Sequence, residues 1–134
     1  MDAKELLLKI DNIHEKGLAA IRQKNLPAYM SIFSDDIEYT QIDGKTIKKA
    51  QFLKDQKAYF LRLVYSNSSY ERLSYEIKDN EFEEILLQNA EISIRVFIFF
   101  KKTWIVKRKG NYCWTLSNNQ LKIKKVKILE ERID

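Results

Sequence analysis

The segment from Leu26 to Tyr39 most constrains the fold, because local structure must change several times within a short stretch. Asn25-Leu26-Pro27 fits the start of a short helix, since proline is tolerated in a first turn. The pair Asp35-Asp36 is expected to break that helix, and residues 37–42 alternate as a strand. Asp43-Gly44 then predicts a turn. The expected order is therefore helix, strand, turn and helix.

Longer helices are expected on both sides of this segment. Residues 3–24 carry one apolar stripe at spacings of three and four residues, formed by Leu7, Ile10, His14, Leu18 and Ile21. Another helix is predicted from Thr46 to about Val64. Tyr65 to Ser69 is expected to be a polar loop.

From Tyr70 onward the chain is expected to be rich in β-strands. The predicted strands cover residues 71–79, 82–88, 91–101, 103–117 and 120–129. Unbroken alternation from Trp104 to Leu116 favours one long strand with Gly110 at a bend or bulge. A change of phase in the last strand predicts a bulge near Lys124-Lys125. Helices first and strands later indicate an α+β domain with a mostly antiparallel sheet.

Length and composition favour a single domain over residues 1–134. Hydrophobic residues make up 45% of the 134 residues, enough for a core. No apolar run approaches the roughly 20 residues of a membrane helix, and Met1-Asp2-Ala3-Lys4-Glu5 does not read as a signal peptide. The single cysteine, Cys113, cannot form an internal disulfide. A cytoplasmic protein without a membrane partner is therefore expected.

Two surface features bear on partners. Phe97 to Phe100 make both faces of one strand apolar, and burial against a second copy would cover the exposed face, so a homodimer through the sheet is predicted. The net charge of +5 permits nucleic-acid binding. Lysines of the late strands could contact phosphates, but glutamates on the neighbouring strands neutralise part of that charge, so nucleic acid is not the favoured partner.

The order of elements, the turn Phe33-Ser34-Asp35-Asp36 and Asp43-Gly44 resemble the nuclear transport factor 2-like (SnoaL-like, cystatin-like) superfamily over nearly the whole chain. The resemblance implies three N-terminal helices packed on a curved sheet that together form a cone. The C-terminal strands look closest to small subunits of aromatic-ring-hydroxylating dioxygenases, through Trp104 to Arg108, Asn118-Asn119 and Leu121 to Leu129. That branch implies a mainly structural role without a metal.

The best-understood catalysts of this fold resemble ketosteroid isomerase, with a tyrosine on the first helix and an aspartate on the first strand. Gly17 and Gln41 stand at those positions here and supply neither a phenol nor a carboxylate. An isomerase of that mechanism is therefore disfavoured. Scytalone dehydratase-like chemistry needs several histidines, and this chain has one.

That histidine and a set of aromatic residues form the candidate site. His14 lies on the apolar stripe and is the candidate proton carrier near neutral pH, although a partly buried histidine bonded to a carbonyl or tyrosine is the favoured interpretation. Arg108 is expected either to hold a carboxylate or to pair with a glutamate such as Glu83 or Glu91. The residues expected to contact a ligand are Tyr29, Phe33, Tyr39, Gln41, Tyr59, Trp104, Arg108 and Trp114.

Two functions remain open at this point. One is a SnoaL-like domain that holds a small, largely apolar molecule in its cone, with lyase, isomerase or cyclase activity. The other is a non-catalytic dimeric accessory subunit whose cone is filled by side chains. Nucleic-acid binding through the late strands is a third, minor alternative. No cofactor and no metal are expected, since one histidine and one cysteine do not make a typical set of zinc ligands.

Overall fold

A computed structural model describes residues 2–116 and 120–134 of the chain, which form three helices and one sheet of six strands. The helices are α1 (Ala3–Arg22), α2 (Leu26–Met30) and α3 (Lys49–Arg62). The strands are β1 (Phe33–Thr40), β2 (Thr46–Ile47), β3 (Leu63–Lys78), β4 (Glu81–Phe97), β5 (Phe100–Thr115) and β6 (Lys122–Ile133). Their order in the sheet is β2-β1-β6-β5-β4-β3, and only β1 and β6 pair in parallel. The predicted α+β architecture is confirmed.

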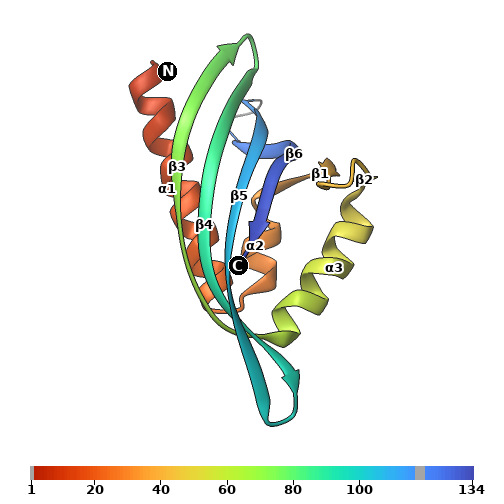
Figure 1. Ribbon diagram of the computed structural model, residues 1–134. Helices are drawn as coiled ribbons and strands as arrows, with labels where there is room; N and C mark the ends of the chain where they lie inside the picture. The colour runs from red at the N-terminus through yellow and green to blue at the C-terminus, as the bar shows by residue number, and fades with distance from the viewer. Residues whose placement is uncertain (1, 117–119) are drawn as a thin grey trace.

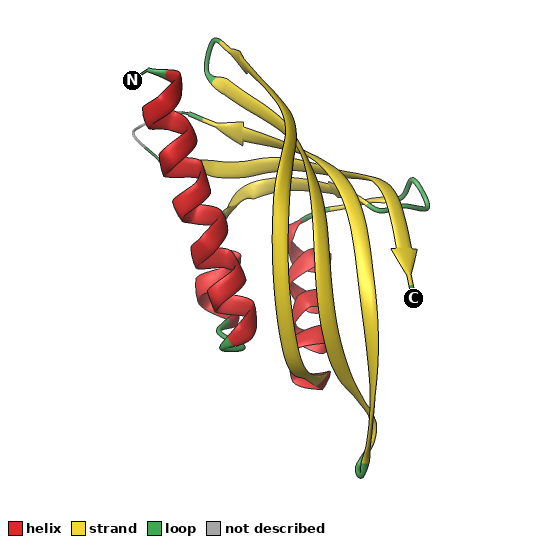
Figure 2. Cartoon of the chain, turned by 60° about the vertical axis from the view of Figure 1, so that its left-hand side comes forward, coloured by secondary structure: helices red, strands yellow, loops and turns green. Residues whose placement is uncertain are grey.

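The sheet bends around the helices. Figures 1 and 2 show the long strands β3, β4 and β5 curving past α1 and α3, which lie on the same side of the sheet. Side chains buried between these layers include Ile10 of α1, Phe52 of α3 and Trp114 of β5. Gly17 brings α1 close to the segment before β1, because a Cβ atom there would lie 2.9 Å from Ile32 Cδ1. The glycine at the isomerase tyrosine position therefore lets α1 approach the Ile32 side chain closely.

Local capping explains where the first helices begin. The Asp2 side chain accepts a hydrogen bond from the Glu5 amide at the start of α1. Asn25 caps α2 in the same way, through the Ala28 amide, and Pro27 occupies the first turn as expected.

One prediction about the second helix is wrong. Helix α2 ends at Met30, and Asp35-Asp36 lie inside β1 and do not break a helix. The cause is a partner distant in sequence, because Phe33 pairs with Ile123 of β6 and thereby starts the strand early. Phe33 and Ile37 are both buried, as alternation along a strand requires.

The β-rich half differs from the predictions in its boundaries. The stretch from Tyr65 to Ser69 belongs to β3 and is not a loop, and the strand predicted at 82–88 continues without a break to Phe97 in β4. The strand predicted at 91–101 is wrong beyond Phe97, because the chain turns at residues 98–99 and Phe100 begins β5. Phe97 and Phe100 therefore pair across a hairpin and do not share one strand. The predicted bulges are confirmed as shifts in register between β5 and β6, at Lys109/Gly110 and where Lys124 is skipped. Asn118-Asn119 lies outside the described residues.

Candidate functional site

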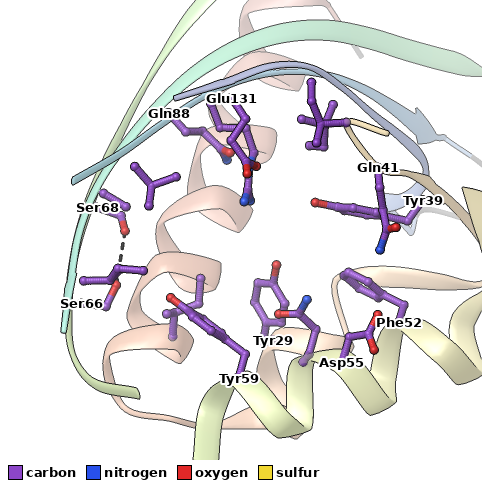
Figure 3. Close-up of a pocket in the computed structure, with 18 of the residues that line it drawn as sticks. Tyr29, Tyr39, Gln41, Phe52, Asp55, Tyr59, Ser66, Ser68, Gln88 and Glu131 are labelled. Carbon is purple, nitrogen blue, oxygen red and sulfur yellow. Dashed lines mark hydrogen bonds and ion pairs between the residues drawn. The ribbon is translucent and has the colours of Figure 1, made fainter. Parts of the chain in front are cut away.

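The space between α3 and the inner face of the sheet is hollow (Figure 3). The cavity has a volume of about 520 Å³ and is lined by residues from α1, α2, α3 and every strand. This volume is in the range of small-molecule sites. Six of the eight residues predicted to contact a ligand line the cavity: Tyr29, Phe33, Tyr39, Gln41, Tyr59 and Arg108.

Three tyrosines from different elements point into this cavity (Figure 3): Tyr29 of α2, Tyr39 of β1 and Tyr59 of α3. Their rings are fixed by aromatic neighbours; the Tyr39 ring stacks on Phe52 at 4.9 Å between centroids. Within residues 2–116 and 120–134, no protein group accepts a hydrogen bond from these three hydroxyls or donates one to them. The hydroxyls are therefore free to bind a ligand or water.

Burial raises the pKa of each of these three phenols. The positive charge of Arg108 acts in the opposite direction but does not cancel the effect. The phenols consequently keep their protons at neutral pH and act as hydrogen-bond donors.

An ion pair lies at the same cavity. Arg108 Nε of β5 donates to Glu131 Oε2 of β6 at 2.8 Å, and both residues line the cavity. Although burial acts to lower it, the pKa of Arg108 is raised by Tyr39 and Glu131. Among the described residues Arg108 has no second hydrogen-bond acceptor, so its terminal nitrogens remain available to a ligand.

Glu131 takes the place of the two glutamates that the sequence offered as partners of Arg108. Glu83 and Glu91 alternate with the inward-facing Glu84 and Ile92 of β4, so they lie on the opposite face from Arg108. Glu83 instead accepts a hydrogen bond from Asn111 at 2.9 Å. The register of β6 against β5 places Arg108 directly across from Glu131.

The two tryptophans predicted to contact a ligand lie elsewhere. Trp114 is fully buried outside the cavity, and its Nε1 donates to Glu84 Oε2 at 2.7 Å. Trp104 lies further along β5, where Lys102 Nζ is 5.1 Å from its ring centroid. Alternation placed both residues on the inner face, but the cavity occupies only the middle of that face.

His14 also lies outside the cavity lining. Its Nε2 is 2.8 Å from Glu84 Oε2, and the side chain of Glu84 is 0% exposed. Arg72 Nε donates to the other oxygen, Glu84 Oε1, at 2.9 Å. A carboxylate only accepts hydrogen bonds, so the His14 Nε2 atom carries a proton and donates it. That nitrogen is therefore not available as a base.

The network continues to the edge of α1. Arg72 Nη2 donates to Asp11 Oδ1 at 2.7 Å, and the Tyr70 hydroxyl donates to the same oxygen at 2.8 Å. Partial burial opposes it, but these two hydrogen bonds lower the pKa of Asp11. The network thus joins α1 to β3, β4 and β5 through paired polar groups.

Several lining residues were missed from the sequence. The polar ones on the strands include Ser66, Ser68, Gln88 and Glu131. Alternation within β3 and β4 could have placed the first three on the inner face. Placing Glu131 at the cavity requires the register of β6 against β5, which the bulges shift, and the sequence alone does not give that register. Within the described residues, no group of three or more His, Cys, Asp or Glu side chains could hold a metal ion.

No known family model matches this chain, and no curated protein matches it either. Its structure is similar to a conserved protein from Planctomyces limnophilus, with a TM-score of 0.81 over 92% of this chain and 94% of that one, at 13% identity. It is also similar to a type 2 hexachlorocyclohexane dehydrochlorinase, with a TM-score of 0.75 over 100% of this chain and 93% of that one, at 13% identity.

A third similar structure is a proposed dehydratase of the nuclear transport factor 2-like family from Streptomyces avermitilis. It has a TM-score of 0.73 over 95% of this chain and 96% of that one, at 5% identity. Across the parts of the chain that the structure describes, no helix is long and apolar enough to cross a membrane. The chain has the nuclear transport factor 2-like, or SnoaL-like, fold.

Proposed function

We propose that this protein binds a small, largely apolar molecule in the cavity between α3 and the sheet. The observation that carries the proposal is the set of three phenol hydroxyls that point into about 520 Å³ of open space without a protein partner among the described residues. Apolar walls with a few convergent polar groups are typical of ligand sites. Phe33 and Gln41 complete the wall beside the three tyrosines.

The donors in the cavity favour a ligand that carries an oxygen acceptor. Tyr29, Tyr39 and Tyr59 offer hydroxyl protons, and Arg108 offers guanidinium protons. Because the Arg108 charge is paired with Glu131, a neutral carbonyl or ether oxygen satisfies these donors without adding an unpaired charge.

We further propose lyase or isomerase chemistry with Glu131 as the base. The names of two structural neighbours, a dehydrochlorinase and a proposed dehydratase, describe eliminations, which remove a proton from carbon. Glu131 is a carboxylate at the cavity, whereas His14 uses its Nε2 proton on Glu84. In this scheme Glu131 takes a proton from the carbon next to the ligand carbonyl, and a phenol donates a hydrogen bond to the enolate oxygen that forms. In a lyase the enolate electron pair then expels a leaving group from the neighbouring carbon as an anion; in an isomerase Glu131 returns the proton to another carbon.

A matched pair of cavity variants tests the binding proposal. Ser68→Phe places a ring in the cavity, whereas Asn67→Phe places the same ring on the outer face of β3. With acetophenone as the probe, saturation-transfer NMR should detect binding to the wild type and to Asn67→Phe but not to Ser68→Phe. Equal binding by both variants would show that the probe does not use the cavity.

The accessory-subunit alternative and the homodimer remain separate proposals. An accessory subunit is expected to have a filled cone, so the open cavity favours a ligand-binding domain. For a homodimer, the exposed side chains of Leu87 and Ile105 offer apolar area on the outer face of adjacent strands. Sedimentation velocity over a range of concentrations tests it. Nucleic-acid binding is the minor alternative: Lys124 pairs with Glu81, whereas Lys125 and Lys127 form no ion pair among the described residues, and a steep loss of affinity with added salt would be its signature.

A further inference from the structure

The end of the β4–β5 hairpin extends beyond the rest of the sheet. On one side of the hairpin, β3 begins at Leu63, which pairs with Ile94 of β4. On the other side, the last backbone hydrogen bonds after β6 join Asp134 to Ile105 of β5. Between Ile94 and Ile105 the hairpin is therefore a ribbon of two strands. Figures 1 and 2 show this ribbon passing the end of α3 with its tip apart from every other element.

The tip of this ribbon is apolar and almost fully exposed. Phe97 is 69% exposed, Ile98 83%, Phe99 90% and Phe100 68%. The aromatic contact at the tip is between Phe97 and Phe100, 6.3 Å apart. Soluble surfaces rarely expose a contiguous apolar patch of this kind unless it binds something. We call these four residues the apolar tip.

A ring of basic residues follows directly behind the apolar tip. Arg95 pairs across the ribbon with Lys101, and Ile94 pairs with Lys102. Lys102 in turn lies over the Trp104 ring. From Ile92 to Gly110 the sequence contains no acidic residue. We call Arg95, Lys101 and Lys102 the basic collar; no carboxylate among the described residues forms an ion pair with it.

We propose that the apolar tip inserts into the surface of a membrane that contains anionic lipids. Phenylalanine and isoleucine enter the boundary between headgroups and acyl chains, while the basic collar lies at the level of the anionic headgroups. Trp104, behind the collar, has the amphipathic ring that such interfaces favour. This proposal replaces the sequence-based expectation that no membrane partner is involved.

Charge favours a lipid surface over a second copy of the chain at the tip. A two-fold contact is self-complementary, so tip-to-tip pairing would bring two basic collars together. Like charges placed side by side oppose association, whereas anionic headgroups attract every residue of the collar. The proposal is independent of the ligand in the cavity, because the tip contributes no residue to its lining.

Flotation with large unilamellar vesicles tests the proposal. The wild type should bind vesicles of phosphatidylcholine with 30% phosphatidylglycerol at low salt and bind phosphatidylcholine alone at least tenfold more weakly. Phe99→Glu should lose binding at least tenfold, since it places a charge in the acyl boundary. Leu8→Glu changes an exposed apolar residue in the N-terminal half of α1, a helix outside the ribbon, and should bind as the wild type does.

The collar is tested by two double variants that each lose two charges. The double variant Arg95→Gln, Lys101→Gln should weaken vesicle binding by roughly 30-fold. Each basic residue near an anionic surface contributes about 1 kcal/mol, and a factor of ten in affinity corresponds to about 1.4 kcal/mol. Lys125→Gln with Lys127→Gln, exposed on β6, should change it much less.

Three results would overturn the proposal. The first is that the wild type does not bind vesicles. The second is that the collar and β6 double variants lose vesicle binding to the same extent. The third is that the wild type is a dimer that Phe99→Glu converts to a monomer. The last would assign the tip to a contact between copies. Loss of acetophenone binding in Ser68→Phe, with vesicle binding intact, leaves both proposals standing.

Discussion

The inner face of the sheet has two regions of opposite character, and β4 contributes to both. At Glu84 the face is solid, because His14, Trp114 and Arg72 all bind one carboxylate whose side chain is 0% exposed. Four residues along the same strand, Gln88 faces the cavity. There three phenol hydroxyls have no hydrogen-bond partner within the described residues. We call these regions the Glu84 network and the tyrosine cavity.

The difference separates structural polar groups from functional ones. A buried polar group whose bonds are all made inside the protein stabilises one arrangement and has little left to offer a ligand. Polar groups that point into open space contribute little to stability and can be satisfied by a ligand. By this criterion His14, the ionisable residue that stands out in the sequence, is a structural residue, and the three tyrosines are the candidates for ligand contact.

The largest effect is expected from breaking the Glu84 network. Glu84→Gln retains one acceptor oxygen for three donors, so at least one buried donor loses its partner. Removing one member of a buried ion pair typically costs 3–5 kcal/mol, and we expect a loss of about 3 kcal/mol in the free energy of unfolding. Urea denaturation measures it.

Glu83→Gln is the matched control for this variant. Glu83 is the neighbouring residue of β4 and bonds Asn111 on the outer face. The amide can still accept that bond, so the expected change is below about 1 kcal/mol. Equal losses of unfolding free energy in Glu83→Gln and Glu84→Gln would show that the Glu84 network contributes no more to stability than a hydrogen bond on the outer face.

A smaller effect is expected for His14→Ala. The variant removes one hydrogen bond to a carboxylate and the ring contacts with Tyr70 and Trp114, but Glu84 keeps its two other donors. We expect a loss of about 2 kcal/mol in unfolding free energy. Acetophenone binding in the cavity should be unchanged in NMR titrations below the unfolding temperature. A His14→Ala variant that is as stable as the wild type but no longer binds acetophenone would show that His14 contributes to ligand binding.

The sequence predicts the network less well than the fold, for a physical reason. Periodicity reports which face of an element is apolar, and this predicted α1, α3 and the long strand β5. The predicted start of α3 was wrong, because Thr46 and Ile47 pair with β1 as the short strand β2. It does not report which residue lies opposite which. His14 and Glu84 are far apart in the sequence, and Arg108 meets Glu131 only through the register of β6, which its bulges shift. The lining tyrosines were predictable because the fold leaves space there.

The smallest effect concerns single hydroxyl groups and contrasts the two regions directly. Tyr70→Phe removes a hydrogen bond to Asp11 in the Glu84 network and should lower unfolding free energy by about 1 kcal/mol. Tyr59→Phe removes a hydroxyl that has no protein partner among the described residues, so its stability should stay within about 0.5 kcal/mol of wild type. Its affinity for acetophenone should fall. If Tyr59→Phe were destabilised as much as Tyr70→Phe, the Tyr59 hydroxyl would be a structural group, and the cavity would be less open than its phenols indicate.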